Sequence, residues 1–194
     1  MPAFIVKAGI FSRFMFLPAH FLNPKQPVLF YGTTPPRLGT SPADVRLAAE
    51  KLVARTSSLD LDGIVVYDVQ DESERTSEPR PFPFLPTLDS RDYARILYEL
   101  SGVPVVTYKA VTQLNEVQWN EWLTESARDF GVKALSLVGS PTRKREGDAI
   151  SLTRATELAA AHPAQFSLGG VAIAERHGGG RSESQRMVQK AQSG

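Results

Sequence analysis

The chain contains no cysteine among its 194 residues. This absence excludes disulfide bonds, zinc sites built from thiolates and a cysteine nucleophile. It is typical of proteins from a reducing compartment, so we expect a cytoplasmic location.

An excess of charge of one sign is also missing. Lysine and arginine together number 22 and aspartate and glutamate 21, which leaves a formal net charge of +1. A nucleic-acid-binding or acidic-membrane-binding protein usually carries a strongly basic surface, so we predict neither kind of partner. Acidic residues gather between Asp68 and Glu74, but without a recognisable ligand spacing, and we predict no metal site.

The chain also lacks an apolar run long enough for a transmembrane helix. The first stretch, Met1–Phe21, is apolar and aromatic, but Lys7 and Arg13 interrupt it and Pro18 ends it. A charge near the centre of a bilayer is costly, so this stretch is a poor membrane span. We interpret residues 1–26 as an N-terminal extension that is poorly ordered or peripheral, and residues 27–194 as one domain.

Short apolar runs alternate with amphipathic segments through this domain. The runs predict strands, because they are too short for helices and rich in β-branched residues; they span residues 28–31, 63–67, 103–107, 132–138 and 166–174. Helical periodicity follows each run, with predicted starts at Ser41, Asp89 or Ser90, Asn115, Ser151 and Ser182. Trp119 and Trp122 fall on the apolar face of the third helix, which we expect to end at Gly131.

Alternating strands and helices predict an α/β protein with a parallel sheet, either a doubly wound open sheet or a (β/α)8 barrel. Both architectures place function at the carboxyl ends of the strands. Polar or small residues at these ends are therefore the site candidates: Thr33, Thr34, Tyr67, Asp68, Gln70, Tyr108, Lys109, Gly139, Ser140, Glu175 and His177.

Three segments, in this order, resemble the methylenetetrahydrofolate reductase family. They are Tyr31–Arg37 (YGTTPPR), Ala134–Pro141 (ALSLVGSP) and Gly169–His177 (GGVAIAERH), the last followed by Lys190. The resemblance implies a TIM-type (β/α)8 barrel, of which five β/α units are present here. It also implies an oxidoreductase of one-carbon metabolism and methionine biosynthesis, with a folate-type substrate, bound FAD, and NADH or NADPH as electron donor.

The resemblance also assigns roles to individual residues. Positions implied to contact the cofactor are Tyr67, Tyr108, Val138, Gly139, Ser140, His177 and Lys190, and positions implied to contact substrate are Thr33, Thr34, Gln70 and Lys109. The family's proton-donating glutamate falls at Gly32 and its flavin-side aspartate at Ser140. Since glycine has no proton to give, we consider Asp68, Tyr108 and Glu175 as substitute acids.

Two alternative functions use the same scaffold. One is a non-catalytic subunit that binds folate or flavin, or that serves as a partner. The other is a lyase that forms a Schiff base through Lys109, at the end of a buried strand. A complete barrel needs about 250 residues, so we expect either a fragment of a longer protein, which we favour, or an oligomer or partner that completes the barrel.

Overall fold

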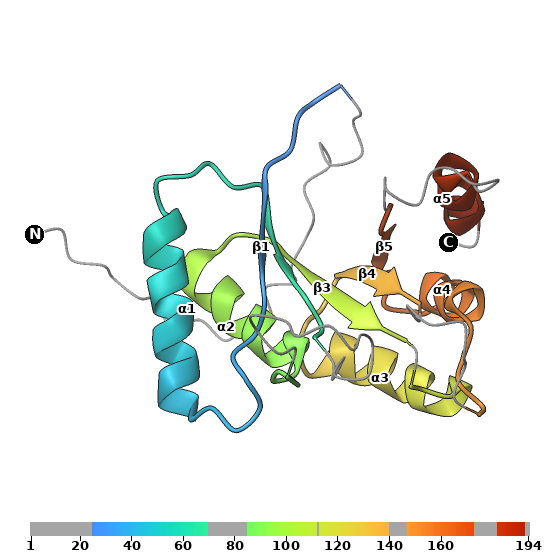
Figure 1. The fold of residues 1–194 in the computed structure, drawn as a ribbon, viewed down its shortest axis with the longest axis horizontal. Helices are drawn as coiled ribbons and strands as arrows, with labels where there is room; N and C mark the ends of the chain where they lie inside the picture. Colours follow the sequence, from blue (N-terminus) through green and yellow to red (C-terminus); the bar gives the residue numbers. More distant parts are fainter. Residues whose placement is uncertain (1–24, 70–84, 112, 140–146, 173–181, 193–194) are drawn as a thin grey trace, which may run out of the picture.

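In the described residues, a parallel sheet of five strands forms one layer of the protein (Figure 1). The computed structural model describes residues 25–69, 85–111, 113–139, 147–172 and 182–192. The five strands lie in sequence order, and each pairs in parallel with the next. Their bounds are β1 Phe30–Thr33, β2 Gly63–Val66, β3 Val105–Ala110, β4 Ala134–Val138 and β5 Ser167–Gly170.

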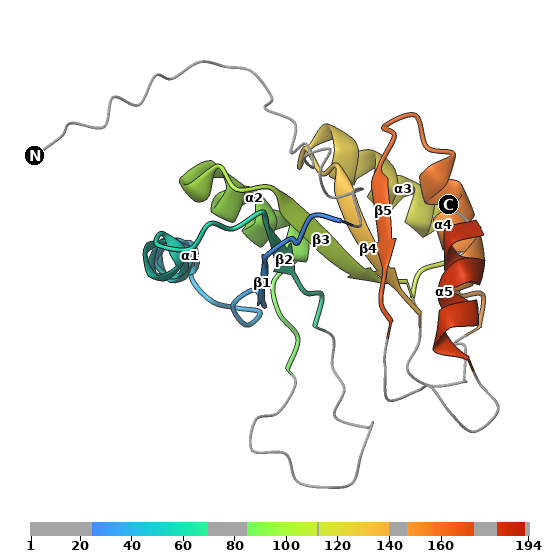
Figure 2. The same cartoon turned by 90° about the horizontal axis from the view of Figure 1, so that it is seen from above.

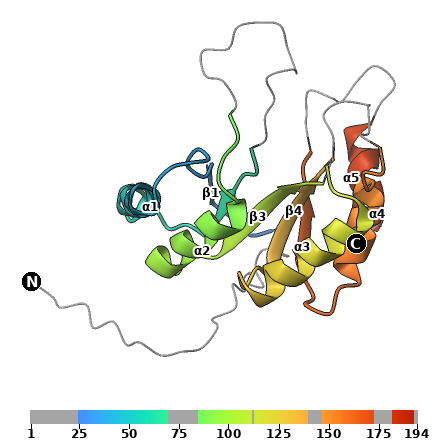
Figure 3. The ribbon, with the colours of Figure 1, turned by 90° about the horizontal axis from the view of Figure 1, so that it is seen from below.

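The helices form an arc along one side of this sheet (Figures 2 and 3). Their bounds are α1 Pro42–Thr56, α2 Ser90–Ser101, α3 Glu116–Arg128, α4 Leu152–Ala160 and α5 Glu183–Gln192. Right-handed crossovers between strands that are neighbours in both sequence and space put every connecting helix on the same side. We call the covered side the helix face and the other side the inner face.

The predicted helix starts are confirmed. Ser41 caps α1, its side chain accepting a hydrogen bond from the amide of Asp44, and Pro42 occupies the first helical position. Asn115 and Gln118 form a reciprocal capping box at α3. Helix α3 ends with its C-cap at Asp129, and the predicted stop, Gly131, lies two residues later in a left-handed conformation with φ of +65°.

Strand β3 begins and ends later than its predicted range of 103–107. Pro104 has no N–H group for the ladder, so pairing starts at Val105. At the other end, Tyr108 and Lys109 pair with Ser136 and Leu137 of β4. Both site candidates therefore lie inside a strand rather than in the loop after it, and the strand's alternation fixes the face that each side chain occupies.

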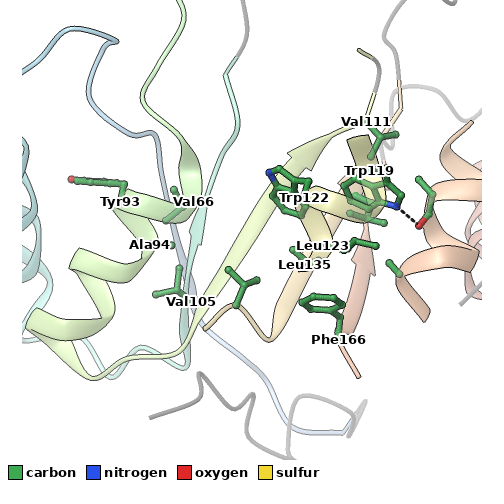
Figure 4. Close-up of a cluster of buried hydrophobic side chains, with 14 of the residues drawn as sticks. Val66, Tyr93, Ala94, Val105, Val111, Trp119, Trp122, Leu123, Leu135 and Phe166 are labelled. Carbon is green, nitrogen blue, oxygen red and sulfur yellow. Dashed lines mark hydrogen bonds between the residues drawn. The ribbon is translucent and has the colours of Figure 1, made fainter. Parts of the chain in front are cut away.

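The apolar core lies between the helix face and the helices (Figure 4). Trp119 is fully buried and Trp122 is 7% exposed, which confirms that both tryptophans pack in the core. Their rings are stacked with centroids 5.1 Å apart, and the indole N–H of Trp119 donates to the carbonyl of Ala155 in α4, at 3.0 Å. This bond fixes α3 against α4.

A buried arginine extends the core between α2 and α3. Arg91 is 7% exposed, and its guanidinium lies 4.8 Å from the ring centroid of Trp122 and 4.5 Å from that of Phe130. It contacts the carboxylate of Asp89 at 2.7 Å and that of Glu125 at 3.4 Å. Burial by itself would raise the pKa of Asp89, but the hydrogen bonds from Arg91 outweigh it and hold that pKa below the ordinary value.

The observed fold confirms the predicted α/β class, and the closed eight-stranded barrel stays a prediction. Within the ranges that the structure describes, no helix is long and apolar enough to cross a bilayer. The extension at residues 1–26 lies almost wholly outside those ranges.

We predict that Asp89→Asn destabilises the protein by about 1 kcal/mol at pH 7, because asparagine keeps the helix cap but removes the charge that compensates Arg91. Because the folded-state pKa is depressed, this contribution exists above the ordinary value of 3.8 and disappears as the pH falls through the lower folded-state pKa. Urea unfolding of both proteins from pH 7 to pH 3 measures the difference.

The matched control is Asp92→Asn, in the same first turn of α2, whose side chain is 52% exposed and lies 3.6 Å from Arg95. It should cost less than about 0.5 kcal/mol. Equal losses for the two variants, or a loss at Asp89 that does not depend on pH, would contradict the assignment.

Candidate functional site

The carboxyl ends of β2 and β3 each present a tyrosine followed by a charged residue. Strand alternation predicts that Tyr67 and Tyr108 point to one face and Asp68 and Lys109 to the other. The contacts agree: the two tyrosine rings lie 5.2 Å apart, centroid to centroid, whereas the Lys109 Nζ lies 5.6 Å from the centroid of Trp122 in α3. The tyrosines are therefore on the inner face and the charged pair is on the helix face.

The two tyrosines form an aromatic surface on the inner face. Their rings meet edge to face, at an interplanar angle of 71°. Tyr67 also lies across β1, because a Cβ atom added to Gly32 would be 2.8 Å from its Oη. Tyr67 is 39% exposed. A planar ligand can therefore reach this aromatic surface.

The charged pair on the helix face joins the ends of the same two strands. Asp68 Oδ2 lies 3.0 Å from Lys109 Nζ, with the side chains only 13% and 16% exposed. The same carboxylate oxygen accepts a hydrogen bond from the amide of Ala110 at 3.1 Å. Ser90, the first residue of α2, donates its hydroxyl to the carbonyl of Tyr108 at 3.2 Å. These bonds hold the backbone that carries both tyrosines.

The sequence-predicted acids are not brought together. Tyr108 lies on the inner face and Asp68 on the helix face, and Glu175 lies outside the described residues. A ligand on the inner face would thus contact Tyr108 and not Asp68. The Schiff-base role of Lys109 also stays a prediction, and the amine has a structural partner in Asp68.

The remaining predicted site residues divide in a similar way. Val138 follows the inner-face alternation of β4, whereas a Cβ atom at Gly139 would be 3.5 Å from Leu152 in α4. Thr33 pairs with the buried Val66, and Thr34 is exposed just beyond β1.

Lys190 lies in α5 and donates to the carbonyl of Val171, after β5. Its Cδ is 3.3 Å from the position of a Cβ on Gly170, so the lysine stem covers the helix-side surface of β5. Gln70, Ser140 and His177 lie outside the described residues. Their roles, like those of the other cofactor and substrate positions, stay predictions.

One inner-face residue was missed by the sequence reasoning. Ser136 is the register partner of Tyr108 on β4, so its side chain belongs to the same face and adjoins the tyrosine pair. The signal was present in the segment Ala134–Val138, where a single polar residue stands among apolar neighbours. The apolar neighbours of Ser136 are typical of a buried run, and they conceal the alternation of faces along the strand.

Of three comparisons with known proteins, only the comparison with solved structures gives a match. No family model matches the sequence, and no curated protein is similar enough to count as a relative. Among solved structures, the chain is similar to an uncharacterized protein from Clostridium thermocellum that binds two copies of 5-methyl-5,6,7,8-tetrahydrofolic acid. The TM-score is 0.70, at 24% sequence identity over 90% of this chain.

The chain spans about half, 54%, of the length of that structural neighbour. At this identity the similarity establishes a shared fold. Membership of the methylenetetrahydrofolate reductase family is not shown by these matches and stays a prediction from the three sequence motifs.

We predict that the Asp68–Lys109 pair couples the ends of β2 and β3. A double-mutant cycle with Asp68→Asn and Lys109→Met should give a coupling free energy of about 1–2 kcal/mol in urea unfolding, because both side chains are largely shielded from water. The exposed pair Arg46–Glu50 on α1, with side chains 57% and 48% exposed, is the matched control. It should give about 0.3–0.5 kcal/mol, and equal coupling in the two cycles would show that the buried pair has no special role.

Proposed function

We propose that this protein binds a reduced folate of the 5-methyltetrahydrofolate class on its inner face, at the carboxyl ends of the strands. The observation that carries the proposal is the similarity in fold, over 90% of this chain, to a protein that binds 5-methyl-5,6,7,8-tetrahydrofolic acid. The sequence resemblance to a folate-dependent enzyme family supports it independently, because that resemblance rests on short motifs rather than on the fold.

The chemistry of the inner face suits such a ligand. Tyr67 and Tyr108 offer aromatic surface on which a pterin ring can stack, and Ser136 adds a hydroxyl in register with Tyr108. The helix face offers no comparable room, since Trp119, Leu123 and their neighbours fill the space between sheet and helices. A ligand at these strand ends is thus expected on the inner face.

We also propose that the sheet is part of a (β/α)8 barrel. In a doubly wound sheet the strand order reverses and helices cover both faces. Here the strands keep their sequence order, and the described helices all lie on one face (Figures 2 and 3). This arrangement is the one that a barrel repeats around its axis. An oligomer or partner that completes the barrel remains part of this proposal.

The finer proposal is a methylenetetrahydrofolate reductase-like oxidoreductase that uses FAD and NADH or NADPH. The three sequence motifs support it. Gly32 favours the alternative, a subunit that binds folate without reducing it, because the position of the family's acid carries no proton. The two differ in whether flavin and turnover accompany folate binding.

We predict that the purified protein binds 5-methyltetrahydrofolate with a dissociation constant on the order of micromolar or lower, measured by isothermal titration calorimetry. The probe p-aminobenzoylglutamate, which lacks the pterin ring, should bind at least about tenfold more weakly if the aromatic surface recognises that ring.

Tyr108→Ala should weaken 5-methyltetrahydrofolate binding by about tenfold, because it removes a stacking partner. Tyr31→Ala is the matched control, since Tyr31 is as exposed as Tyr67, at 39%, and alternation places it on the other face of β1. Absence of folate binding by the wild-type protein would refute the proposed function.

We predict from the reductase proposal that the protein retains flavin through desalting, with an absorption band at about 450 nm, a property of the oxidised cofactor. An absorption spectrum with and without added FAD measures this. A colourless protein that still binds 5-methyltetrahydrofolate would contradict the reductase proposal and favour the binding subunit.

A further inference from the structure

Gly32 and Tyr67 occupy the same place on the inner face. A Cβ atom built on Gly32 would lie 2.8 Å from Tyr67 Oη, 2.9 Å from its Cε2 and 3.2 Å from its Cζ. Two of these distances are shorter than real Cβ contacts allow. Any side chain at position 32 must therefore displace the far end of the Tyr67 ring. Because Gly32 on β1 has no side chain, the Tyr67 ring at the end of β2 occupies the space that such a side chain would need.

The position of this ring is fixed from its other side by Tyr108. The two rings meet edge to face with centroids 5.2 Å apart, within the range that aromatic pairs favour. Their backbone is held from the helix face by the Asp68–Lys109 ion pair and by the bond from Ser90 to the carbonyl of Tyr108. The pair is thus held between β1 and β3 before any ligand arrives.

The Tyr67 ring is nevertheless available to a ligand. It is 39% exposed, and within the described part of the chain its hydroxyl makes no hydrogen bond. An exposed ring lying over strand backbone offers a planar apolar surface with a neutral hydrogen-bonding group at its tip. The resemblance implies a carboxylic acid at position 32, whereas the structure has the phenol of Tyr67 beside Gly32.

We propose that Gly32 and Tyr67 act as one unit that sets the ligand specificity of the site: glycine leaves room for the phenol, and the tyrosine pair is the platform on which the heterocycle of the folate stacks. This inference rests on the proposed function. It assigns Tyr67 and Tyr108 direct contacts with the ligand, while Gly32 is a positioning residue that acts through the Tyr67 ring.

The decisive variant is Gly32→Ala. The atoms that a new methyl group would meet belong to the tip of a flexible side chain, so the ring can swing away and the protein still folds. We expect a melting temperature close to that of the wild type, with 5-methyltetrahydrofolate binding weakened about tenfold by loss of the stacking surface. Circular dichroism measures the first quantity and titration calorimetry the second.

A double-mutant cycle separates this mechanism from a local disturbance of β1. Tyr67→Ala should weaken binding by a similar factor, and Gly32→Ala added to it should have no further effect, because the ring that the methyl group displaces is already gone. Tyr67→Phe should keep stacking and lose only the hydroxyl contact, a change of about threefold to tenfold. Tyr31→Phe, on the opposite face of β1, should bind like the wild type.

The outcomes distinguish the two proposals. A wild-type protein that binds no folate refutes the proposed function. A wild-type protein that binds 5-methyltetrahydrofolate, with Gly32→Ala and Tyr67→Ala unchanged in affinity, refutes this inference alone. Additive losses in the cycle also refute it, because they show that position 32 acts on binding by a route other than Tyr67. The inference is supported if Gly32→Ala and Tyr67→Ala weaken binding by a similar factor and if adding Gly32→Ala to Tyr67→Ala weakens binding no further.

Discussion

The site depends on how the ends of β2 and β3 are joined. On the helix face, Asp68 pairs with Lys109 and also accepts a hydrogen bond from the amide of Ala110. On the inner face, the residues just before them, Tyr67 and Tyr108, meet edge to face. Because consecutive residues of a strand point to opposite faces, the ion pair and the aromatic pair share one stretch of backbone. The ion pair therefore also positions the two tyrosine rings.

The two faces of the sheet differ in what covers them. The helix face is filled by the apolar core and by the Arg91 cluster, in which a buried guanidinium lies over the rings of Trp122 and Phe130. Trp122 also faces Lys109. The core on the helix face thus contacts the Asp68–Lys109 ion pair through Trp122. The inner face, by contrast, presents exposed aromatic and small residues, which leave the surface open to a flat ligand.

The similarity to the Clostridium thermocellum protein is a similarity of fold. At 24% identity two chains can share a fold because packing demands apolar residues of suitable size at suitable spacing rather than identical ones. Ligand binding restricts the choice of residues more strongly than packing does, since it depends on particular chemical groups at particular positions. In this chain, glycine at position 32 leaves room for the Tyr67 ring, while β1 and β2 stay in register beneath it.

Features that depend on neighbours along the chain could be predicted from the sequence. The capping residues Ser41 and Asn115 marked their helices because a cap bonds to amides a few residues away. Periodicity likewise identified the strands and the buried tryptophans. Which strand-end residues share a face depends on how the strands pair, because a shift of one residue in a strand moves every side chain to the other face. The fit of Tyr67 over Gly32 could not be predicted either: the two residues lie on different strands, and their contact exists only once the strands are paired.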